Sequence, residues 1–537
     1  MRVGPVSPGP PSAGTQSYVD RTLILRTLLP GAESLIEVLD VMPPDGSGRI
    51  VRRLKVLRGP ADVAVEVVPG PGAERVDVWS EGVRVDGLQV WCGVAMTLSN
   101  APPPAPARPL RRLVATGIVR LDTDEELVVT LDPGRRPALS LAEALELEDR
   151  AARHWRRVAD RVAVPGRYGA DAARSALVVA ALCGTAGAPV DSPATSLPRV
   201  IGGERNRDGR VVHPVDAAAW AEIATSIGLI EESEAALRWL VGALDHEPPL
   251  AADLAADGDV APGEHPLAGL TGWRRSQPVI TGSDAADRRS TEPSAAAVAA
   301  ASSLAAGASG AAALSGWPRV VAHADWLADH WADPDASVWD VRGPDRAWHS
   351  PRLATRRALS LAATEARRRH PLDLDAPGWQ ASRRDIEAWF RERGLGPTGV
   401  LTSGVPGSAD AALARVARWG PWPADDPVTA GTLARIAERL GHGPWIHPYP
   451  PDVDDGLPGT EPARLTATLW VAGALAARGR WDEAHERMEA AIALAGPLHL
   501  LPEAVDATTG APLGNRPAAA AHISFIDTAV ALAAAPS

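Results

Sequence analysis

Apolar and polar residues alternate, or apolar residues run in short stretches, along the chain from Arg21 to about Leu131. The runs are of strand length and rich in β-branched residues, and turn sequences such as PPDGSG, GPGAE and DPG separate them. They read TLILRTLL, SLIEVLDV, RIVRRLKVL, DVAVEVV, LQVWCGVAMTL, RLVATGIVRL and ELVVTL. Such runs between turns are typical of antiparallel strands. We therefore predict an antiparallel β-sandwich over 19–138, preceded by a Pro/Gly/Ser-rich, disordered segment over 1–18.

The spacing of the apolar positions becomes helical near Leu139. The first helical segment, SLAEALELEDRAARHWRRVADRV, has Ser140 as its capping residue, and we predict a linker helix over 139–166. Nearly every periodic segment after Tyr168 is helical as well. The pattern predicts helices over 168–184, 215–228, 232–245, 293–313, 317–332, 352–370, 380–394, 407–418, 427–440, 462–478, 481–494 and 517–534.

These helices follow one another in pairs, without the fixed repeat length that a solenoid shows. Such pairing favours a closed all-α toroid, which we place at 167–537. Long Pro/Gly-rich loops connect some of the helices, at 185–214, 246–292, 333–351 and 495–516. We expect these loops to gather at one end of the barrel and to carry the function. We expect no strand within 215–330 and no parallel sheet anywhere.

Composition excludes several classes of function. Lys+Arg 54 against Asp+Glu 66 gives a net charge of −12, which argues against nucleic acid or an anionic membrane as partner. The one lysine, Lys55, lies in the strand-like run RRLKVLRG with no glycine-rich loop before it. It therefore cannot serve as the lysine of a P-loop, a kinase or a pyridoxal-phosphate enzyme.

The two cysteines, Cys92 and Cys183, lie far apart in sequence and suggest neither a zinc site nor a disulfide framework, so we expect a reducing compartment. The N-terminal segment MRVGPVSPGPPSAGTQSYVD contains no apolar signal-like stretch. The least polar stretch, from Ala295 to Leu314, is too weakly apolar to cross a bilayer. We therefore expect a cytoplasmic protein that associates with no membrane.

Familiar catalytic signatures such as HExxH and GxSxG are absent, and DVDDGLPGTEPA fails the spacing of an EF-hand loop. His323 and His330 share a helix face, and we interpret them as solvated or core residues and not as metal ligands. We expect no metal and no cofactor. Asp340 in SVWDVRGPDRAWH and Glu503 in LLPEAVD are candidate catalytic carboxyls, because glycoside hydrolysis needs a proton donor and a base. They could instead cap helices or pair with arginines such as Arg342.

Longer segments carry a family resemblance. VDSPATSLPRVIGGERNRDGR and HPVDAAAWAEIATSIGLIEESEAALRWL resemble the bacterial branch of glycoside hydrolase family 15, the glucoamylase- and trehalase-like enzymes. The likeness continues through GWRRSQPVITGSDAAD, WLADHWADPDASVWDVRG, PADDPVTAGTLARIAERLG, DDGLPGTEPARLTATLW and LLPEAVDATTGAPLGNRPAAAAH, over about 20–534. The resemblance implies an N-terminal antiparallel β super-sandwich, a linker helix, an (α/α)6 toroid barrel, and a small-molecule or oligosaccharide substrate.

The resemblance also implies roles for single residues. Asp340 stands where the family has the glutamate that donates a proton, and Glu503 where it has the glutamate that acts as base. Asp216 survives from a Trp-Leu-Arg-Asp segment that grips sugar hydroxyls, where this chain has His213, Pro214 and Val215 before it. The remaining candidates for substrate binding are Arg207 in place of a tryptophan, Arg288 in place of a glutamine, Trp339 and Arg342 near Asp340, and Glu461.

Because residues that the family uses to bind sugar are replaced, the sequence indicates a degenerate active site. Three hypotheses remain. The first is an inverting glucosidase-type hydrolase of an α-glucoside or related saccharide. The second is an impaired pseudoenzyme that binds a saccharide or a protein. The third is a repurposed acid–base enzyme acting on a non-sugar, for example a natural product. If the chain is a hydrolase, we expect Glu503→Gln to lower kcat by at least about 10²-fold with little change in the fold. The substrate and the oligomeric state are left open.

Overall fold

The computed structural model describes residues 2–5, 14–68, 75–86, 88–101, 112–134, 136–286, 288, 290–307, 311–339, 341–342, 345–369, 375–405 and 408–534. Asp340 lies outside the described residues. The chain divides into two compact units, Met1–Asp160 and Arg161–Ser537. The domain limits expected from the sequence, at 19–138, 139–166 and 167–537, stay a prediction.

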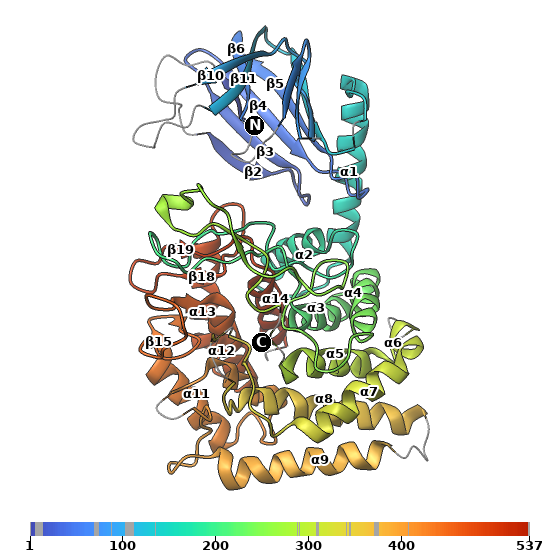
Figure 1. Ribbon diagram of the computed structural model, residues 1–537, viewed down its shortest axis with the longest axis vertical. Helices are drawn as coiled ribbons and strands as arrows, with labels where there is room; N and C mark the ends of the chain where they lie inside the picture. The colour runs from blue at the N-terminus through green and yellow to red at the C-terminus, as the bar shows by residue number, and fades with distance from the viewer. Residues whose placement is uncertain are drawn as a thin grey trace. The chain divides into compact units, whose positions relative to one another are not determined.

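The first unit is a sandwich of two antiparallel sheets, as the alternating pattern predicts (Figure 1). One sheet has the strand order β1-β6-β11-β10 and the other β2-β3-β4-β5-β12-β9-β8-β7. The strands are β1 (Arg2–Pro5), β2 (Thr15–Tyr18), β3 (Leu25–Pro30), β4 (Leu35–Val41), β5 (Ile50–Arg58), β6 (Ala61–Val67), β7 (Val76–Trp79), β8 (Gly82–Val85), β9 (Leu88–Trp91), β10 (Thr97–Ala101), β11 (Arg112–Leu121) and β12 (Glu126–Asp132).

Alternation along the strands sends apolar side chains from both sheets into one core. Val63 and Val65 of β6 belong to the same buried cluster as Leu54 and Val56 of β5, which lie in the other sheet. Neighbouring positions on each strand point away from this core, because successive side chains of a strand face opposite sides. The period of two in the sequence is therefore the cause of the sandwich.

The disorder expected for 1–18 is wrong for the described part of that segment. β1 pairs with β6, and β2 pairs with β3 in antiparallel register. β2 is mostly exposed, so hydrophobic burial does not hold it there. Its backbone hydrogen bonds to β3 do, and an outermost strand can pair in this way whatever the polarity of its side chains.

The helix α1 (Leu141–Arg161) begins with the cap that the sequence predicts. Ser140 Oγ accepts a hydrogen bond from the backbone N–H of Glu143 at 3.3 Å, and the Glu143 carboxylate accepts one from the backbone N–H of Ser140 at 2.8 Å. This reciprocal pair is a capping box. Ala144 and Leu147 then pack with Val51 in a second buried cluster, which contains side chains of β4 and β5.

We expect Ser140→Ala to lower the free energy of unfolding of the first unit by about 1 kcal/mol, because the substitution removes the side-chain cap of α1. Urea denaturation at neutral pH measures the change. Ser80→Ala, at an exposed turn between β7 and β8, serves as the control. Equal stability of the two variants would show that the cap contributes nothing.

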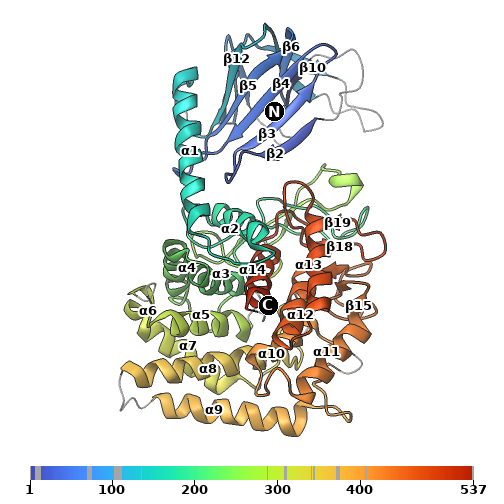
Figure 2. The same cartoon turned by 180° about the vertical axis from the view of Figure 1, so that it is seen from behind.

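The second unit, whose helices are labelled in Figure 2, is an (α/α)6 barrel. Its inner and outer helices alternate along the chain. Its helices are α2 (Gly169–Cys183), α3 (Pro214–Ser226), α4 (Ile230–Ala243), α5 (Thr291–Leu304), α6 (Ala311–Ser315), α7 (Trp317–His330), α8 (Ser350–Arg369), α9 (Asp375–Trp389), α10 (Val416–Trp419), α11 (Pro427–Leu440), α12 (Leu465–Ala477), α13 (Trp481–Ala495) and α14 (Ala519–Ala533). Short segments of other helix types are η1 (Trp273–Arg275), the π-type η2 (Phe390–Gly394) and η3 (Ala411–Arg415).

The inner ring closes because each of its helices contacts the next. In order around the ring these are α3, α5, α8, η3 with α10, α12 and α14, and α14 contacts α3 again. The others pack outside, for example α4 on α3, α9 on α8 and α13 on α12. Alanine and glycine are frequent on the inner helices, as in LTATLWVAGALAA of α12, and small side chains allow these helices to approach closely. Helix pairing in the sequence thus predicts this architecture.

Two expectations about local structure are wrong. The loop 246–292 folds back on itself and forms the short antiparallel pair β13 (His265–Pro266) and β14 (Ile280–Thr281), with one isolated parallel bridge between Gly263 and Ser283. Strands within 215–330 therefore do occur, since a long loop satisfies its backbone groups by pairing with itself. The helix predicted over 407–418 is a 3₁₀ segment, η3, followed by the single turn α10.

Further short pairs lie in other loops. They are β15 (Gly441–His442) with β16 (Trp445–Ile446), and β17 (Ala463–Arg464) with β18 (Ala504–Val505) and β19 (Pro512–Leu513). The second group matters for the site, because Glu503 directly precedes β18 and Arg464 ends β17. None of the described helices combines the length and the apolar character that crossing a membrane requires.

Candidate functional site

A pocket of about 100 Å³ lies at the N-terminal ends of the inner helices α3, α5, α12 and α14. All the long loops named above contribute to its wall, as expected from their placement in the sequence. At the ~30 Å³ that one water occupies in the liquid, this volume corresponds to about three waters. The charged residues of its wall are Asp191, Arg207, His213, Asp216, Asp253, Glu292, Arg464 and Glu503.

Glu503 lies in this wall with both carboxylate oxygens occupied. Oε1 accepts hydrogen bonds from Arg199 Nε at 3.0 Å and Arg464 Nη1 at 2.6 Å, and Arg207 Nη1 lies 3.8 Å away. Oε2 accepts from the backbone N–H of Asn515 at 3.2 Å. Gly514 closes the other side, since a Cβ there would lie 2.6 Å from Oε2. Little room remains for water at either oxygen.

The arginines also set the acidity of Glu503. Burial by itself raises the pKa of this carboxyl, but the charges of Arg199, Arg464 and Arg207 outweigh burial and hold its pKa well below the usual value of 4.5. A carboxylate with such a low pKa is a weak base, because it gains little by accepting a proton. Glu503 is therefore an anion that neutralises arginines, placed in the pocket wall.

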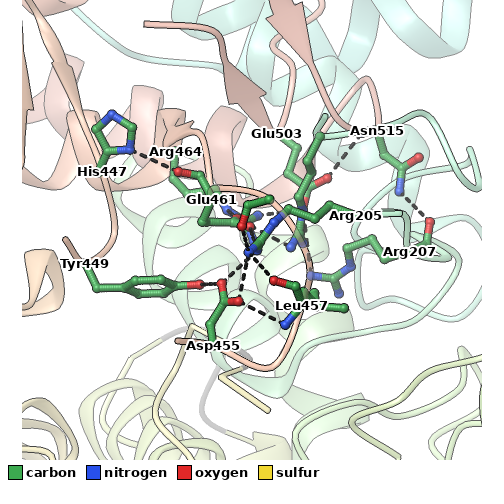
Figure 3. Close-up of polar contacts among 12 residues, drawn as sticks. Arg205, Arg207, His447, Tyr449, Asp455, Leu457, Glu461, Arg464, Glu503 and Asn515 are labelled. Atoms are coloured by element: carbon green, nitrogen blue, oxygen red, sulfur yellow. Dashed lines mark hydrogen bonds and ion pairs between the residues drawn. The ribbon is translucent and has the colours of Figure 1, made fainter. Parts of the chain in front are cut away.

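Glu461 continues the same network (Figure 3) and lies outside the pocket lining. Its Oε1 accepts from Arg464 Nε at 2.6 Å, and its Oε2 accepts from Arg205 Nη1 at 2.8 Å. Arg205 in turn donates to Asp455 at 2.7 and 2.8 Å, and the hydroxyl of Tyr449 donates to Asp455 at 2.6 Å. The carboxylates and arginines alternate, so each buried charge has a partner of opposite sign.

His213 precedes α3 and lies between two aspartates. Its Nδ1 is 3.1 Å from Asp216 Oδ2, and its Nε2 is 3.1 Å from Asp253 Oδ1 and 2.7 Å from Arg207 Nη2. Burial lowers the pKa of His213 and the nearby Arg207 lowers it further, but the two carboxylates outweigh both and raise its pKa well above 6.5. The same contact with His213 holds the pKa of Asp253 low against the effect of burial.

Asp191, His213 and Asp216 place donor atoms within 4.8 Å of one another, which is the arrangement among the described residues that most resembles a metal site. Both nitrogens of His213 already face aspartates, and Arg207 adds a positive charge beside them. A cation would have to compete with that guanidinium. We interpret the group as an ion-pair cluster.

Two other carboxyls in the wall have the opposite character. Asp191 is 3% exposed and Glu292 is 1% exposed, and burial raises the pKa of each. Asp191 Oδ2 and Glu292 Oε2 have no hydrogen-bond partner among the described residues, although Glu292 Oε1 accepts from Arg415. The pocket therefore contains two carboxyls driven toward the neutral form beside two, Asp253 and Glu503, held as anions.

Of the sequence candidates, the structure brings Glu503, Asp216, His213, Arg207 and Trp339 into one wall. The indole of Trp339 donates to Asp410 Oδ1 at 2.7 Å, and its ring centroid lies 5.3 Å from that of Trp470, which also lines the pocket. Asp340 follows Trp339 in sequence but lies outside the described residues, so its role as a donor stays a prediction.

Three candidates lie outside the described pocket lining. Arg288 pairs with Asp284 and donates to the Val341 carbonyl at 3.3 Å. Arg342 pairs with the same Asp284 and with Glu264, each at 3.0 Å. These pairs connect the loops 246–292 and 333–351. Glu461 has the position described above, within the arginine network.

Sequence reasoning missed Asp191, Asp253 and Glu292 and the arginines Arg199 and Arg464. Nothing in the sequence distinguishes these three acids from the other aspartates and glutamates, of which the chain has 66 in all. Glu461 and Arg464 pair three positions apart but precede α12, so the helical i, i+3 pattern gives no signal for this ion pair. No local pattern predicts that arginines gather around Glu503, since Arg199 is 304 positions away in the sequence.

Comparisons with known proteins point to one family. The family model "Glycosyl hydrolases family 15" matches residues 174–489. A trehalase of Mycolicibacterium smegmatis is 29% identical over 429 residues, which are 76% of this chain and 63% of that protein. A trehalase of Thermoplasma volcanium is 30% identical over 384 residues, 70% of this chain and 60% of that protein. The chain thus spans less than two thirds of the length of these relatives.

Solved structures share the fold. A bacterial glucoamylase complexed with acarbose superposes with a TM-score of 0.67 over 97% of this chain and 86% of that one, at 12% identity. A structure described as "Glycosidase Wild Type" has a TM-score of 0.53 over 68% of this chain and 96% of that one, at 19% identity. At such identities the likeness concerns the fold and not the site.

Proposed function

Because the chain belongs to family 15 of the glycosyl hydrolases, we propose that its pocket binds an α-glucoside or a related saccharide without hydrolysing it through Glu503. The observation that carries this proposal is the contrast among the carboxyls of the wall. Asp191 and Glu292 each have a buried oxygen without a partner among the described residues, whereas both oxygens of Glu503 are occupied.

The unpartnered oxygens of Asp191 and Glu292 support binding of a polar ligand. A buried polar atom without a hydrogen bond costs about 1–3 kcal/mol, so a ligand that supplies the bond regains that free energy. Saccharide hydroxyls both donate and accept hydrogen bonds, and so fit carboxyls in either protonation state. Trp339 and Trp470 add aromatic surface in the same wall, against which the apolar face of a sugar ring can pack.

The contacts of Glu503 oppose hydrolysis. The base of an inverting enzyme must bind a water and take its proton, and it works best with a pKa near the operating pH. A water at Glu503 would have to displace Arg464, Arg199 or the Asn515 amide. The accepted proton would also be held weakly. Binding without rapid turnover is the function that this geometry favours.

We expect Asp191→Ala to weaken saccharide binding about tenfold, since one buried hydrogen bond to the ligand is lost. Isothermal titration calorimetry with methyl α-glucoside, maltose and trehalose measures the change. Asp385→Ala, an exposed aspartate on α9, is the matched control. Unchanged affinity in Asp191→Ala would exclude Asp191 from binding, and no binding of any of these saccharides to the wild type would refute the proposal.

The second candidate is an inverting hydrolase that uses Asp340 and Glu503. It is favoured by the place of Glu503 and Asp216 in one wall with Trp339, which precedes Asp340, and by the trehalase relatives. Glucose release from trehalose and maltose separates the two functions. We expect none from the wild type. Release that falls by at least about 10²-fold in Glu503→Gln would establish the hydrolase instead.

A further inference from the structure

A second cavity, of about 260 Å³, lies inside the ring of inner helices, and we call it the axial cavity. Its wall comes from α3, α5, α8, η3, α10, α12 and α14, which together form the whole inner ring. Residues from the first turns of α3 and α5 to the last turns of α3 and α14 line it, so it follows the length of these helices. Protein interiors are usually close-packed, so open space of this size between inner helices is notable, although it is not sealed, since Arg418 and Asp527 of its wall are 53% and 28% exposed.

Small side chains leave this space open. Ala218 of α3, Ala295 and Ala299 of α5, and Gly473 and Ala474 of α12 all line the axial cavity. Short side chains on facing helices do not meet across the ring, although the same residues allow neighbouring helices to pack closely. Larger apolar residues of the wall include Ile223, Leu469 and Ile523, so much of the wall is apolar.

The axial cavity adjoins the pocket. Val215, Asp216, Glu292 and Trp470 line both spaces and form their common wall. Glu292 in this wall is 1% exposed, and its Oε2 has no hydrogen-bond partner among the described residues. The unpartnered oxygen is a second and independent sign of a ligand, because a native interior rarely leaves such an atom unsatisfied.

Charged residues also line the axial cavity. Arg357 forms an ion pair with Glu222 at 2.6 Å, and Arg418 pairs with Asp527. All four residues line the cavity. These charges are paired with one another, so a ligand that matches both spaces has a polar part for the pocket and an apolar part that lies against the small side chains of the axial cavity.

We propose that the chain binds an amphiphilic saccharide, a single sugar ring that carries an unbranched apolar chain, with the ring in the pocket and the apolar chain in the axial cavity. The inference rests on the proposed saccharide-binding function and specifies the class of ligand. The junction between the sugar ring and the apolar chain lies at the common wall, where Glu292 Oε2 forms a hydrogen bond with a hydroxyl of the ligand. The apolar chain of the ligand contacts the alanines of α3, α5 and α12.

Titration with a series of α-glucosides tests the inference. Methyl, propyl, pentyl and heptyl α-glucoside, each below its critical micelle concentration, are titrated into the full chain in a calorimeter. We expect affinity to rise about fourfold with each added methylene until the axial cavity is filled, since each buried methylene contributes a similar free energy. Equal affinity for methyl and heptyl glucoside would overturn the inference.

Variants that fill the axial cavity sharpen the test. We expect Ala299→Leu to remove the gain with chain length, and circular dichroism establishes that the variant is folded. Gly473→Ala is a milder variant that folds safely, because its new Cβ lies at the ordinary contact distance of 3.4 Å from Thr528 Oγ1. In this variant we expect affinity to stop rising at a shorter alkyl chain than in the wild type. Ala434→Leu, at an exposed position of the outer helix α11, should keep the full gain.

The outcomes separate this inference from the proposed function. If affinity still rises with alkyl chain length in both Ala299→Leu and Gly473→Ala, the alkyl chain lies outside the axial cavity. That result would overturn the inference while saccharide binding stands. Heptanol serves as a chain without a sugar. If heptanol binds as tightly as heptyl glucoside, the sugar contributes nothing and the proposed function itself fails.

Discussion

Glu503→Gln is expected to lower the free energy of unfolding of the barrel by about 3–5 kcal/mol, because removal of one charge from a buried ion-pair network leaves its partners uncompensated. Glu503 is 6% exposed, and Arg199 and Arg464 both donate to its Oε1. A glutamine has almost the same shape but no charge. The substitution therefore conserves size but leaves Arg199 and Arg464 without their shared anion.

The pH dependence of this variant provides a second measurement. The pKa of Glu503 is lower in the folded protein than its ordinary value of 4.5, so unfolding takes up a proton below about that pH. The stability that Glu503 contributes is therefore fully present above pH 4.5 and lost as the pH falls toward the folded pKa. We expect this part of the acid dependence to be absent from Glu503→Gln.

Chemical denaturation at pH 7 and pH 4 measures both effects. Glu483→Gln is the matched control, because Glu483 pairs with Arg480 on the surface, with exposed fractions of 40% and 58%. An exposed pair of this kind contributes at most about 1 kcal/mol. A loss of stability no larger in Glu503→Gln than in Glu483→Gln would contradict the arrangement of charges described for the pocket wall.

The second large effect is expected on acidification of the wild type. Lowering the pH from 7 to 4 should reduce the free energy of unfolding of the barrel by at least about 3 kcal/mol. The cause is a pair of buried histidines, His499 and His522, which both contact Ser175 Oγ, at 3.1 and 3.0 Å. Neither lies in the pocket wall.

The hydrogen bonds of this cluster fix each imidazole in its neutral form. The backbone N–H of Leu501 donates to His522 Nε2 at 3.0 Å, so that nitrogen carries no proton and Nδ1 donates to Ser175. Ser175 then donates to His499 Nε2, and His499 Nδ1–H faces Asp171 Oδ1 at 3.4 Å. A further proton on His522 would set two N–H groups against each other.

Burial and these contacts lower both pKa values. Burial, with a smaller effect of Arg174, lowers the pKa of His499 from 6.5 to about 4, and burial with the neighbouring His499 lowers that of His522 well below 6.5. The unfolded chain takes up protons below pH 6.5 while the folded chain does not, so stability falls between pH 6.5 and about 4.

His213 acts in the other direction and at higher pH. Its raised pKa contributes stability that is present below pH 6.5 and lost as the pH rises through the folded pKa.

His499→Gln should flatten the dependence between pH 6.5 and 4 by about 3 kcal/mol, measured as the difference between the two ends of that range. The comparison within one variant removes the cost of the substitution itself. His330→Gln changes a histidine that is 44% exposed and is expected to leave the slope as in the wild type. An unchanged slope in His499→Gln would exclude His499 as its source.

Much of the fold follows from the sequence because its causes are local. The direction of a side chain changes with a period of two along a strand and 3.6 along a helix, so the change of period near Leu139 separates the strands, which end at Asp132, from the helices, which begin at Leu141. The meeting of loop residues in one wall is predictable for a similar reason. Glu503, His213, Arg207 and Trp339 all lie in loops between the paired helices. Loops at one end of a closed ring must lie near one another, and the pocket wall contains these residues.

The tertiary structure alone decided the chemical state of the site. Whether Glu503 is a base or a neutralising anion depends on Arg199 and Arg464, which the chain brings to it from 304 and 39 positions away. The unpartnered oxygens of Asp191 and Glu292 depend in the same way on what surrounds them after folding. Charge, burial and empty space are properties of neighbours in three dimensions, and a local pattern of residue types does not specify which distant residues those neighbours are.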